Sequence, residues 1–161
     1  MPDGPPQKPP DYDDDFYAWT QHQAAVLREM AVSDNSFDRE NVAEEIETLG
    51  RSERDAVRSQ VRRVIEHFLK LQHPPADAPR LRWMCCVNDA RGTLGDKLSQ
   101  TLRRDVQERL ASLYEDARYQ AELGLREYGE AEAAERLPLD CPFTLDQILE
   151  ARWYPDPVVK P

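Results

Sequence analysis

Glycine and long apolar runs are both scarce in this chain of 161 residues. Its six glycines are too few for the many tight turns of an all-β fold. No apolar run approaches the roughly 18 residues that a membrane-spanning helix requires, and the polar start MPDGPPQKPP does not resemble a secretion signal. We therefore expect a protein of amphipathic helices that stays in the cytoplasm and enters no membrane.

Motifs that carry known chemistry are missing as well. The three cysteines form no Cys-x-x-Cys pair, and Cys85 and Cys86 are adjacent, so neither a disulfide framework nor a zinc knuckle is expected. The three histidines are never three or four residues apart, and the chain has no nucleophile elbow, phosphate loop or dinucleotide fingerprint. We predict no cofactor and no metal site, and these absences argue against an enzyme.

The strongest pattern that is present is one long helix between Asp38 and His73. Asp38 can cap its start, and the two prolines after His73 end it. Gly50 falls inside this helix, where it marks a kink or a close approach by a neighbouring helix. Apolar residues recur three and four apart and share one face: Val42, Ile46, Leu49, Val57, Val61, Val64, Phe68 and Leu71.

Shorter periodic stretches predict helices on both sides of the long one. The first ends near Met30, a third follows a proline-rich linker at residues 74–79 and carries its apolar side to Leu102, and a fourth runs from about Asp105 to Tyr128. The predicted fold class is therefore all-α, a bundle of about four main helices with a proline-rich C-terminal tail packed on it.

The two ends of the chain are rich in proline. We expect residues 1–11 to be a disordered N-terminal tail and residues 12–157 to form a single helical domain. Near the C-terminus, prolines surround one short helix that Thr144 can cap. The tail is expected to pack on the bundle through four large apolar side chains: Leu139, Phe143, Ile148 and Trp153.

Five stretches, which together cover most of residues 11–155, carry a resemblance to a known family. They are DYDDDFYAWTQHQAAVLRE (11–29), FDRENVAEEIETLGRSER (37–54), LRWMCCVNDAR (81–91), YEDAR (114–118) and CPFTLDQIL (141–149). In these stretches, and most specifically in NVAEEIETLGRSER, the chain resembles the Domain of Unknown Function 29 family, helical proteins found mostly in bacteria. The resemblance implies an all-helical bacterial protein and implies no activity.

A line of polar residues shares the inner face of the predicted helices. At about 100° per residue, Glu53, Gln60 and His67 fall on the side of the long helix that carries the apolar stripe. Arg91 falls on the inner face of the third helix. Because a buried polar group needs a partner, we expect Arg91 to pair with Glu53 or another inner carboxylate.

This polar line has two interpretations. It is either a structural network or a polar pocket completed by a facing carboxylate such as Glu115 or Asp116. Glu53 and His67 lie about 21 Å apart along one helix, so they cannot share one metal ion.

Charge is unevenly distributed along the chain. Residues 1–50 hold 12 acidic and 3 basic residues, residues 51–104 hold 6 and 12, and residues 105–157 hold 13 and 5. In the basic middle, four arginines share the face of the long helix opposite the apolar stripe: Arg51, Arg54, Arg58 and Arg62. This arginine ridge could follow an acidic protein surface or a phosphate backbone, or it is a solvated face supported by neighbouring carboxylates.

These patterns favour a non-enzymatic cytoplasmic protein-interaction or regulatory module that docks by charge complementarity. The partner would be another protein or a second copy of the chain. Two alternatives stay open, a metal-binding or enzymatic bundle that uses the polar line and weak nucleic-acid binding through the arginine ridge. Nucleic acid is the less favoured partner, since the net charge is −10 and no aromatic residues interleave the ridge.

Overall fold

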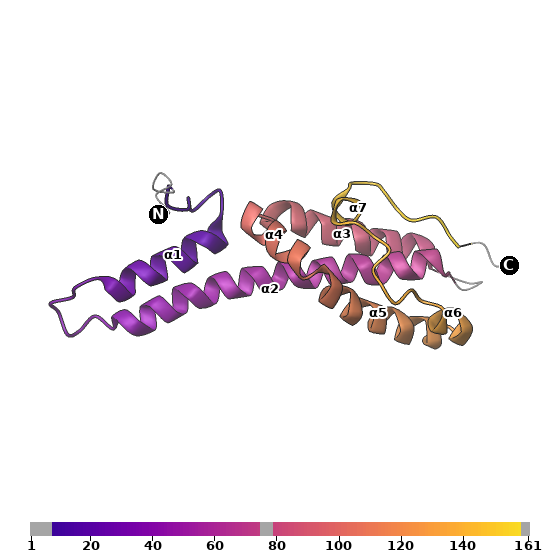
Figure 1. The fold of residues 1–161 in the computed structure, drawn as a ribbon, viewed down its shortest axis with the longest axis horizontal. Coiled ribbons are helices and arrows are strands. Elements are labelled where there is room, and N and C mark those ends of the chain that lie inside the picture. The colour runs from indigo at the N-terminus through magenta and orange to yellow at the C-terminus, as the bar shows by residue number, and fades with distance from the viewer. Residues whose placement is uncertain (1–7, 75–78, 159–161) are drawn as a thin grey trace, which may run out of the picture. The chain divides into compact units, whose positions relative to one another are not determined.

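The computed structural model describes residues 8–74 and 79–158, and every regular element in them is a helix (Figure 1). The helices are α1 (Phe16–Glu29), α2 (Arg39–Gln72), α3 (Arg80–Lys97), α4 (Gln100–Glu108), α5 (Leu110–Glu127), α6 (Ala131–Glu135) and α7 (Leu145–Leu149). The predicted all-α fold class is confirmed. Most of the predicted disordered tail, residues 1–7, lies outside the described residues.

The chain divides into two compact units, and both α2 and α4 contribute residues to each. Unit 1 comprises residues 1–56 and 99–103, and unit 2 comprises residues 57–98 and 104–161. The single helical domain expected over residues 12–157 stays a prediction.

The long helix α2 begins and ends where the sequence predicts. At its start the Asp38 carboxylate accepts the Asn41 N–H at 3.2 Å. The predicted apolar stripe is buried only in the second half of the helix. Its buried members are Val57, Val61, Val64, Phe68 and Leu71. In the first half, by contrast, Val42 is 36% exposed and Leu49 is 57% exposed, because α1 packs against a different face of α2.

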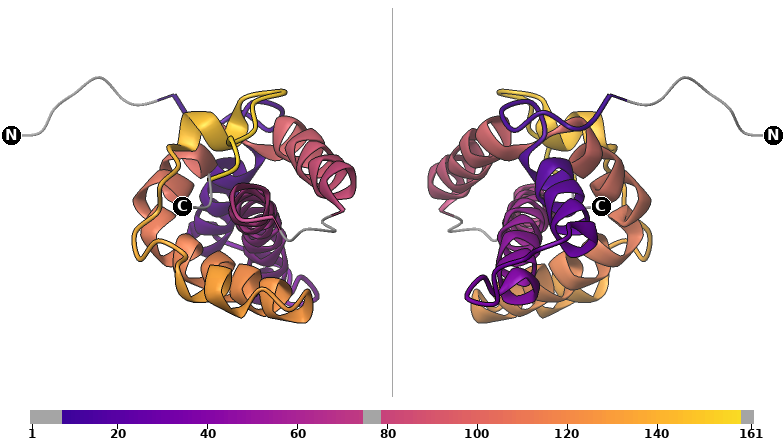
Figure 2. Two further views of the ribbon diagram at one scale, coloured as in Figure 1. Left: turned by 90° about the vertical axis from the view of Figure 1, so that its right-hand side faces the viewer. Right: turned by 90° about the vertical axis from the view of Figure 1, so that its left-hand side faces the viewer.

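In unit 1, α1 and the first half of α2 form an antiparallel hairpin, with the two helices side by side (Figures 1 and 2). Small buried residues line the contact: Thr20, Ala24, Ala43 and Gly50. A Cβ added at Gly50 would overlap Thr20 Oγ1. Of the two predictions for this glycine, the close approach of a neighbouring helix is therefore the one that the structure shows.

In unit 2, larger side chains surround the second half of α2, with α3 and α5 on different sides of it (Figure 2). Phe68 of α2 is completely buried, and so are Val87 of α3 and Leu125 of α5. Trp83 of α3 is almost fully buried beside them. This unit therefore has the apolar core that the hairpin of unit 1 lacks.

The predicted third and fourth helices are divided differently in the structure. The third was expected to continue to Leu102, but α3 ends at Lys97. The Ser99 hydroxyl then accepts the Leu102 N–H at 3.3 Å, which starts the separate short helix α4. A second break at Arg109 separates α4 from α5. The first break depends on a local hydrogen bond that apolar periodicity does not reveal, whereas no side-chain hydrogen bond caps α5 at Arg109.

The C-terminal segment, residues 137–158, contacts the helices of unit 2. Burial raises the pKa of Tyr114 to about 12, and its hydroxyl donates to the Pro138 carbonyl at 2.6 Å. Thr144 caps α7 in a capping box, as predicted. Of the four apolar side chains expected to anchor the tail, Leu139 is instead 82% exposed, and the others are buried or half-buried.

Candidate functional site

The hairpin of unit 1 has one apolar side that its own helices leave uncovered. Thr20 and Ala24 of α1 face Ala43 and Gly50 of α2 across the contact. Because the helices are antiparallel, residues one position before these contact positions point to the same side of the pair. On that side lie six exposed or half-buried side chains, here called the apolar face: Trp19, Val26, Met30, Val42, Ile46 and Leu49.

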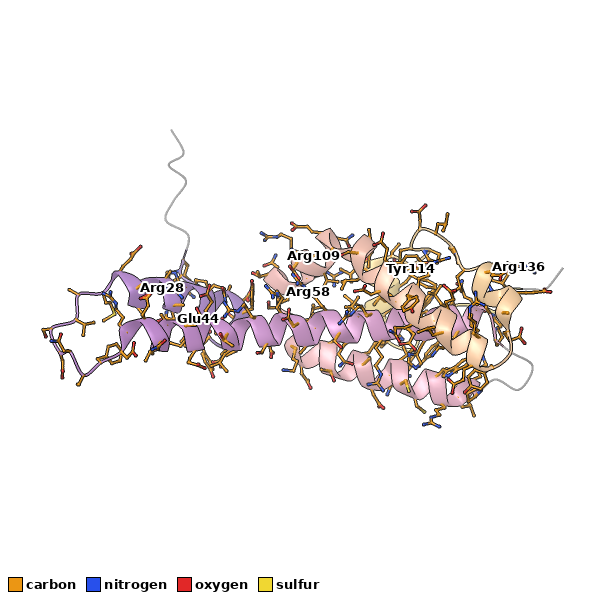
Figure 3. The ribbon with its side chains drawn as sticks, turned by 90° about the horizontal axis from the view of Figure 1, so that it is seen from below. Arg28, Glu44, Arg58, Arg109, Tyr114 and Arg136 are labelled. Atoms are coloured by element: carbon orange, nitrogen blue, oxygen red, sulfur yellow. The ribbon has the colours of Figure 1, made fainter. Side chains whose placement is uncertain are left out.

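The opposite side of the hairpin is a network of ion pairs (Figure 3). The Arg28 guanidinium binds Glu47 at 2.8 Å, Glu40 at 3.3 Å and Glu44 at 3.4 Å. Arg51 binds Glu44 at 2.6 Å. These contacts lower the pKa of Glu47, mainly through the hydrogen bond from Arg28. The charges of this side are therefore satisfied within the hairpin.

The surroundings of the apolar face are acidic. Glu29 and Glu45 are exposed at its outer edge, and neither forms an ion pair with any described residue. Over residues 8–56 and 99–103, unit 1 carries 13 acidic and 6 basic side chains. A partner that covers the face would therefore meet apolar side chains inside a negative rim.

A second candidate site is a pocket of about 530 Å³ between α2 and α5 in unit 2. It is lined mainly by charged and polar side chains: Ser59, Arg62, Arg63, Glu66, His67, Asp116, Ala117, Tyr119 and Gln120. Three of its charged residues are neutralised locally, since Arg62 binds Asp116 at 3.2 Å and Glu66 binds Lys70 at 2.6 Å.

His67 is the most buried polar side chain of this pocket, with 9% of its surface exposed. Its Nδ1 lies 2.8 Å from the Arg63 carbonyl, which can only accept, so Nδ1 carries the proton. Burial lowers the pKa of His67, and the imidazole is therefore neutral at pH 7. Its Nε2 is consequently a hydrogen-bond acceptor.

A family model, Domain of unknown function DUF29, matches residues 12–154 of this sequence. The chain belongs to the DUF29 family. Its structure is also similar to the crystal structure of an α-helical protein of unknown function from Rhodospirillum rubrum. The TM-score is 0.80 and the sequence identity 25%, over 91% of this chain and 93% of that one. A comparison with curated proteins finds no match.

The arginine ridge of this DUF29 chain is engaged in ion pairs along its whole length. Arg58 binds both carboxylate oxygens of Asp105, at 2.8 Å from Nε and 2.6 Å from Nη2. Arg54 binds Asp55 at 3.0 Å, and Arg51 and Arg62 bind the glutamate and aspartate named above. Use of the ridge by an external partner stays a prediction, and it would require these pairs to open.

The polar line is divided between the two units of the DUF29 fold. Glu53 belongs to unit 1, and Gln60, His67 and Arg91 belong to unit 2. Glu53 and Gln60 are half-buried, and neither lines the pocket that contains His67. The structure therefore assigns the members of the line to different surroundings, and a shared functional role for them stays a prediction.

Arg91 binds main-chain carbonyls in place of the carboxylate that the sequence predicts. Its guanidinium donates to the carbonyls of Gln147, Ile148 and Trp153, each at 2.9 Å. It also lies over the Phe68 ring, 5.2 Å from the centroid. Arg91 therefore connects α3 to the C-terminal segment.

Neither the apolar face nor most of the pocket is predicted by the sequence. Periodicity places Val26 and Met30 on the same side of the first helix, but it cannot tell a covered stripe from an uncovered one. For the pocket, the spacing of Ser59, Arg63 and His67 by four residues was an available signal, because such residues share a helix face.

Among residues 8–74 and 79–158, no three histidine, cysteine, aspartate or glutamate side chains are grouped so that they could hold a metal ion. No described helix of the DUF29 chain is both long and apolar enough to cross a membrane.

Proposed function

We propose that this protein is a non-enzymatic interaction module that binds one amphipathic helix of a partner protein on the apolar face of unit 1. The observation that carries the proposal is the pair of uncovered apolar stripes, one on each helix of the hairpin. Two neighbouring helices with apolar stripes on the same side form a groove that a third helix can fill.

Burial of this face provides the driving force for binding. Each large apolar side chain that moves from water into a contact contributes on the order of 1.5–3 kcal/mol when fully buried. Trp19 is the natural anchor, since tryptophan is enriched among the residues that dominate binding energy. It is held by edge-to-face contact with Tyr12, at 4.8 Å between ring centroids.

The charge of unit 1 decides which helix fits. A second copy of the hairpin would bring another acidic rim against Glu29 and Glu45, and like charges across an interface are unfavourable. A helix with lysine or arginine beside its apolar stripe would instead meet opposite charge. The partner is therefore a basic amphipathic helix, and a second copy of this chain is the disfavoured occupant.

We also propose that this interaction takes place in the cytoplasm of a bacterium. The resemblance to a Rhodospirillum rubrum protein supports a bacterial source, and the three free cysteines support the reducing cytoplasm. Nucleic acid is the less favoured partner because each arginine of the ridge has a carboxylate partner.

The test uses a synthetic helical peptide of leucine and lysine, about five turns long. Binding to the full chain, measured by isothermal titration calorimetry, should show a dissociation constant of about 10 µM that rises with salt. The substitution Leu49→Gln on the apolar face should weaken binding about tenfold. The matched control is Leu81→Gln on α3, where a leucine is 77% exposed but lies in unit 2.

Three results would contradict the proposal. Equal binding of a leucine and glutamate peptide would remove the charge argument. Equal losses for Leu49→Gln and Leu81→Gln would place the site elsewhere. Sedimentation velocity gives the third, since a dimer that Leu49→Gln dissociates would make a second copy the occupant.

A further inference from the structure

We propose that the pocket between α2 and α5 in unit 2 binds a small monocarboxylate that also carries a hydroxyl group. Two groups in the pocket define this ligand, the Nε2 atom of His67 and the guanidinium of Arg63. The inference is independent of the docking proposal, because the pocket belongs to unit 2 and the apolar face to unit 1.

His67 supplies a built hydrogen-bond acceptor. Its Nδ1–H donates to the Arg63 carbonyl, which fixes both the tautomer and the ring orientation. No described residue forms a hydrogen bond with Nε2. Every fully buried side-chain nitrogen or oxygen of the described residues has a hydrogen-bond partner, so Nε2 is not fully buried. Nε2 is therefore open to the pocket, although the residue as a whole is nine-tenths buried. A donor on a ligand is the group that completes it.

Arg63 supplies the uncompensated charge. The other basic groups at the pocket have acidic partners, with Arg62 on Asp116 and Lys70 on Glu66. The Arg63 side chain is exposed and makes no ion pair or hydrogen bond with a described residue. One free guanidinium matches one carboxylate, which it can bind through two parallel hydrogen bonds.

The uncompensated charge also selects the donor of the ligand. Because Arg62 is paired with Asp116 and Glu66 with Lys70, Arg63 leaves the pocket with an excess positive charge, which disfavours an ammonium group beside it but not a hydroxyl group. Exposed polar side chains from both helices, such as Ser59 and Gln120, offer further hydrogen bonds. The volume of about 530 Å³ lies within the range of small-molecule sites and is larger than the smallest such ligands need.

The test follows the side-chain nitrogens of ¹⁵N-histidine-labelled full chain by NMR while one of three probes is added. Glycolate has the carboxylate and the hydroxyl, acetate has only the carboxylate, and ethylene glycol has only hydroxyls. Glycolate should shift the Nε2 resonance of His67, with a dissociation constant of about 10 mM. His22 and His73, which do not line the pocket, should stay unshifted. Acetate should bind about fivefold more weakly than glycolate, and ethylene glycol should cause no shift.

Two substitutions separate the roles of the two groups. Arg63→Gln should weaken glycolate about tenfold, and the matched Arg82→Gln, another exposed arginine of unit 2, should leave it unchanged. His67→Phe should make glycolate and acetate bind equally, as read from the backbone amide shifts of Arg63 and Gln120. Because Arg63 is on the surface, its variant tests the site even if His67→Phe fails to fold.

Several outcomes would overturn the inference. These are the absence of a His67 shift with glycolate, equal binding of glycolate and acetate to the unsubstituted protein, or full binding to the Arg63→Gln variant. A shift of all three histidines together would indicate a general effect of the anion and would also reject the site. None of these results bears on peptide binding by unit 1, so the two proposals fail separately.

Discussion

Unit 1 and unit 2 share the helix α2 but bury very different side chains along it. In unit 2 the helix presents Phe68 and its apolar neighbours to α3, α5 and the C-terminal segment, and these side chains are buried. In unit 1 the contact with α1 is made by alanine, threonine and glycine, and the larger Val42 and Leu49 remain exposed. The same amphipathic pattern therefore forms a core in one unit and an open surface in the other.

This difference indicates how each unit is stabilised. Apolar burial is the main favourable contribution to folding, and it is concentrated in unit 2. Unit 1 depends more on helix propensity, the close approach at Gly50 and the ion pairs of Arg28, each of which contributes little by itself. Unit 1 is thus the part of the chain that a bound helix would stabilise most.

The largest expected effect tests the core of unit 2 against the surface of unit 1. Phe68→Ala removes a ring that contacts Phe143 and Trp153, at 5.1 and 5.3 Å between centroids, and should lower the unfolding free energy by about 3–5 kcal/mol. Leu49→Ala should change it by less than about 0.5 kcal/mol. Urea unfolding followed by circular dichroism measures both, and similar losses would show that Leu49 is covered.

A smaller loss is expected when the connection between α3 and the C-terminal segment is weakened. Arg91→Lys keeps the charge, but the compact ammonium group of lysine cannot replace the planar guanidinium that donates to three carbonyls at once. The free energy of unfolding should fall by about 2–3 kcal/mol, measured by urea unfolding with tryptophan fluorescence. Arg82→Lys, at an exposed position of the same helix, is the control and should cost almost nothing.

One glycine in each unit offers the same substitution with opposite expected signs. Gly50→Ala would force α1 away from α2 and should destabilise unit 1 by about 1–3 kcal/mol. Gly92→Ala on α3 meets no atom within 4 Å and should stabilise unit 2 by roughly 0.5–1 kcal/mol. Hydrogen exchange of the amides in each unit gives the measurement. A neutral result at Gly50 would mean that the hairpin is open in solution.

The smallest expected effect is a pH dependence that arises in unit 2. Burial lowers the pKa of His67 below its ordinary value of 6.5, so the unfolded chain takes up the proton first as the pH falls. Stability is therefore complete above pH 6.5 and decreases below it until the pH passes the folded pKa. Urea midpoints between pH 8 and pH 5 should show this decrease, and His67→Gln should reduce it.

Local patterns predicted much of the helical architecture. The ends of α2 could be placed because a capping aspartate and two prolines act on their immediate neighbours. The cap of α7 at Thr144 was predictable for the same reason. The breaks after Lys97 and at Arg109 were missed, because no proline or capping motif marks them as clearly.

The candidate site was predictable only in part, because its partners come from distant parts of the chain. Arg91 was placed correctly on the inner side of a helix, but its partners are carbonyls more than fifty positions later in the chain. His67 was singled out as a buried polar residue, yet the importance of Arg63 appears only when the ion pairs of its neighbours are known. The pairing of Arg58 with Asp105 likewise needed the position of α4.

By itself the sequence determined which segments form helices, which of their faces are apolar and which family the chain belongs to. The helical segments and their apolar faces follow from short-range contacts and from periodicity along one helix, whereas the family follows from the resemblance of the sequence over residues 12–154. The tertiary structure alone decided which apolar faces are covered, which arginines keep an unpaired charge and where a pocket opens. Burial and charge pairing depend on segments far apart in the chain, and their arrangement cannot be read from the spacing of residues along one helix.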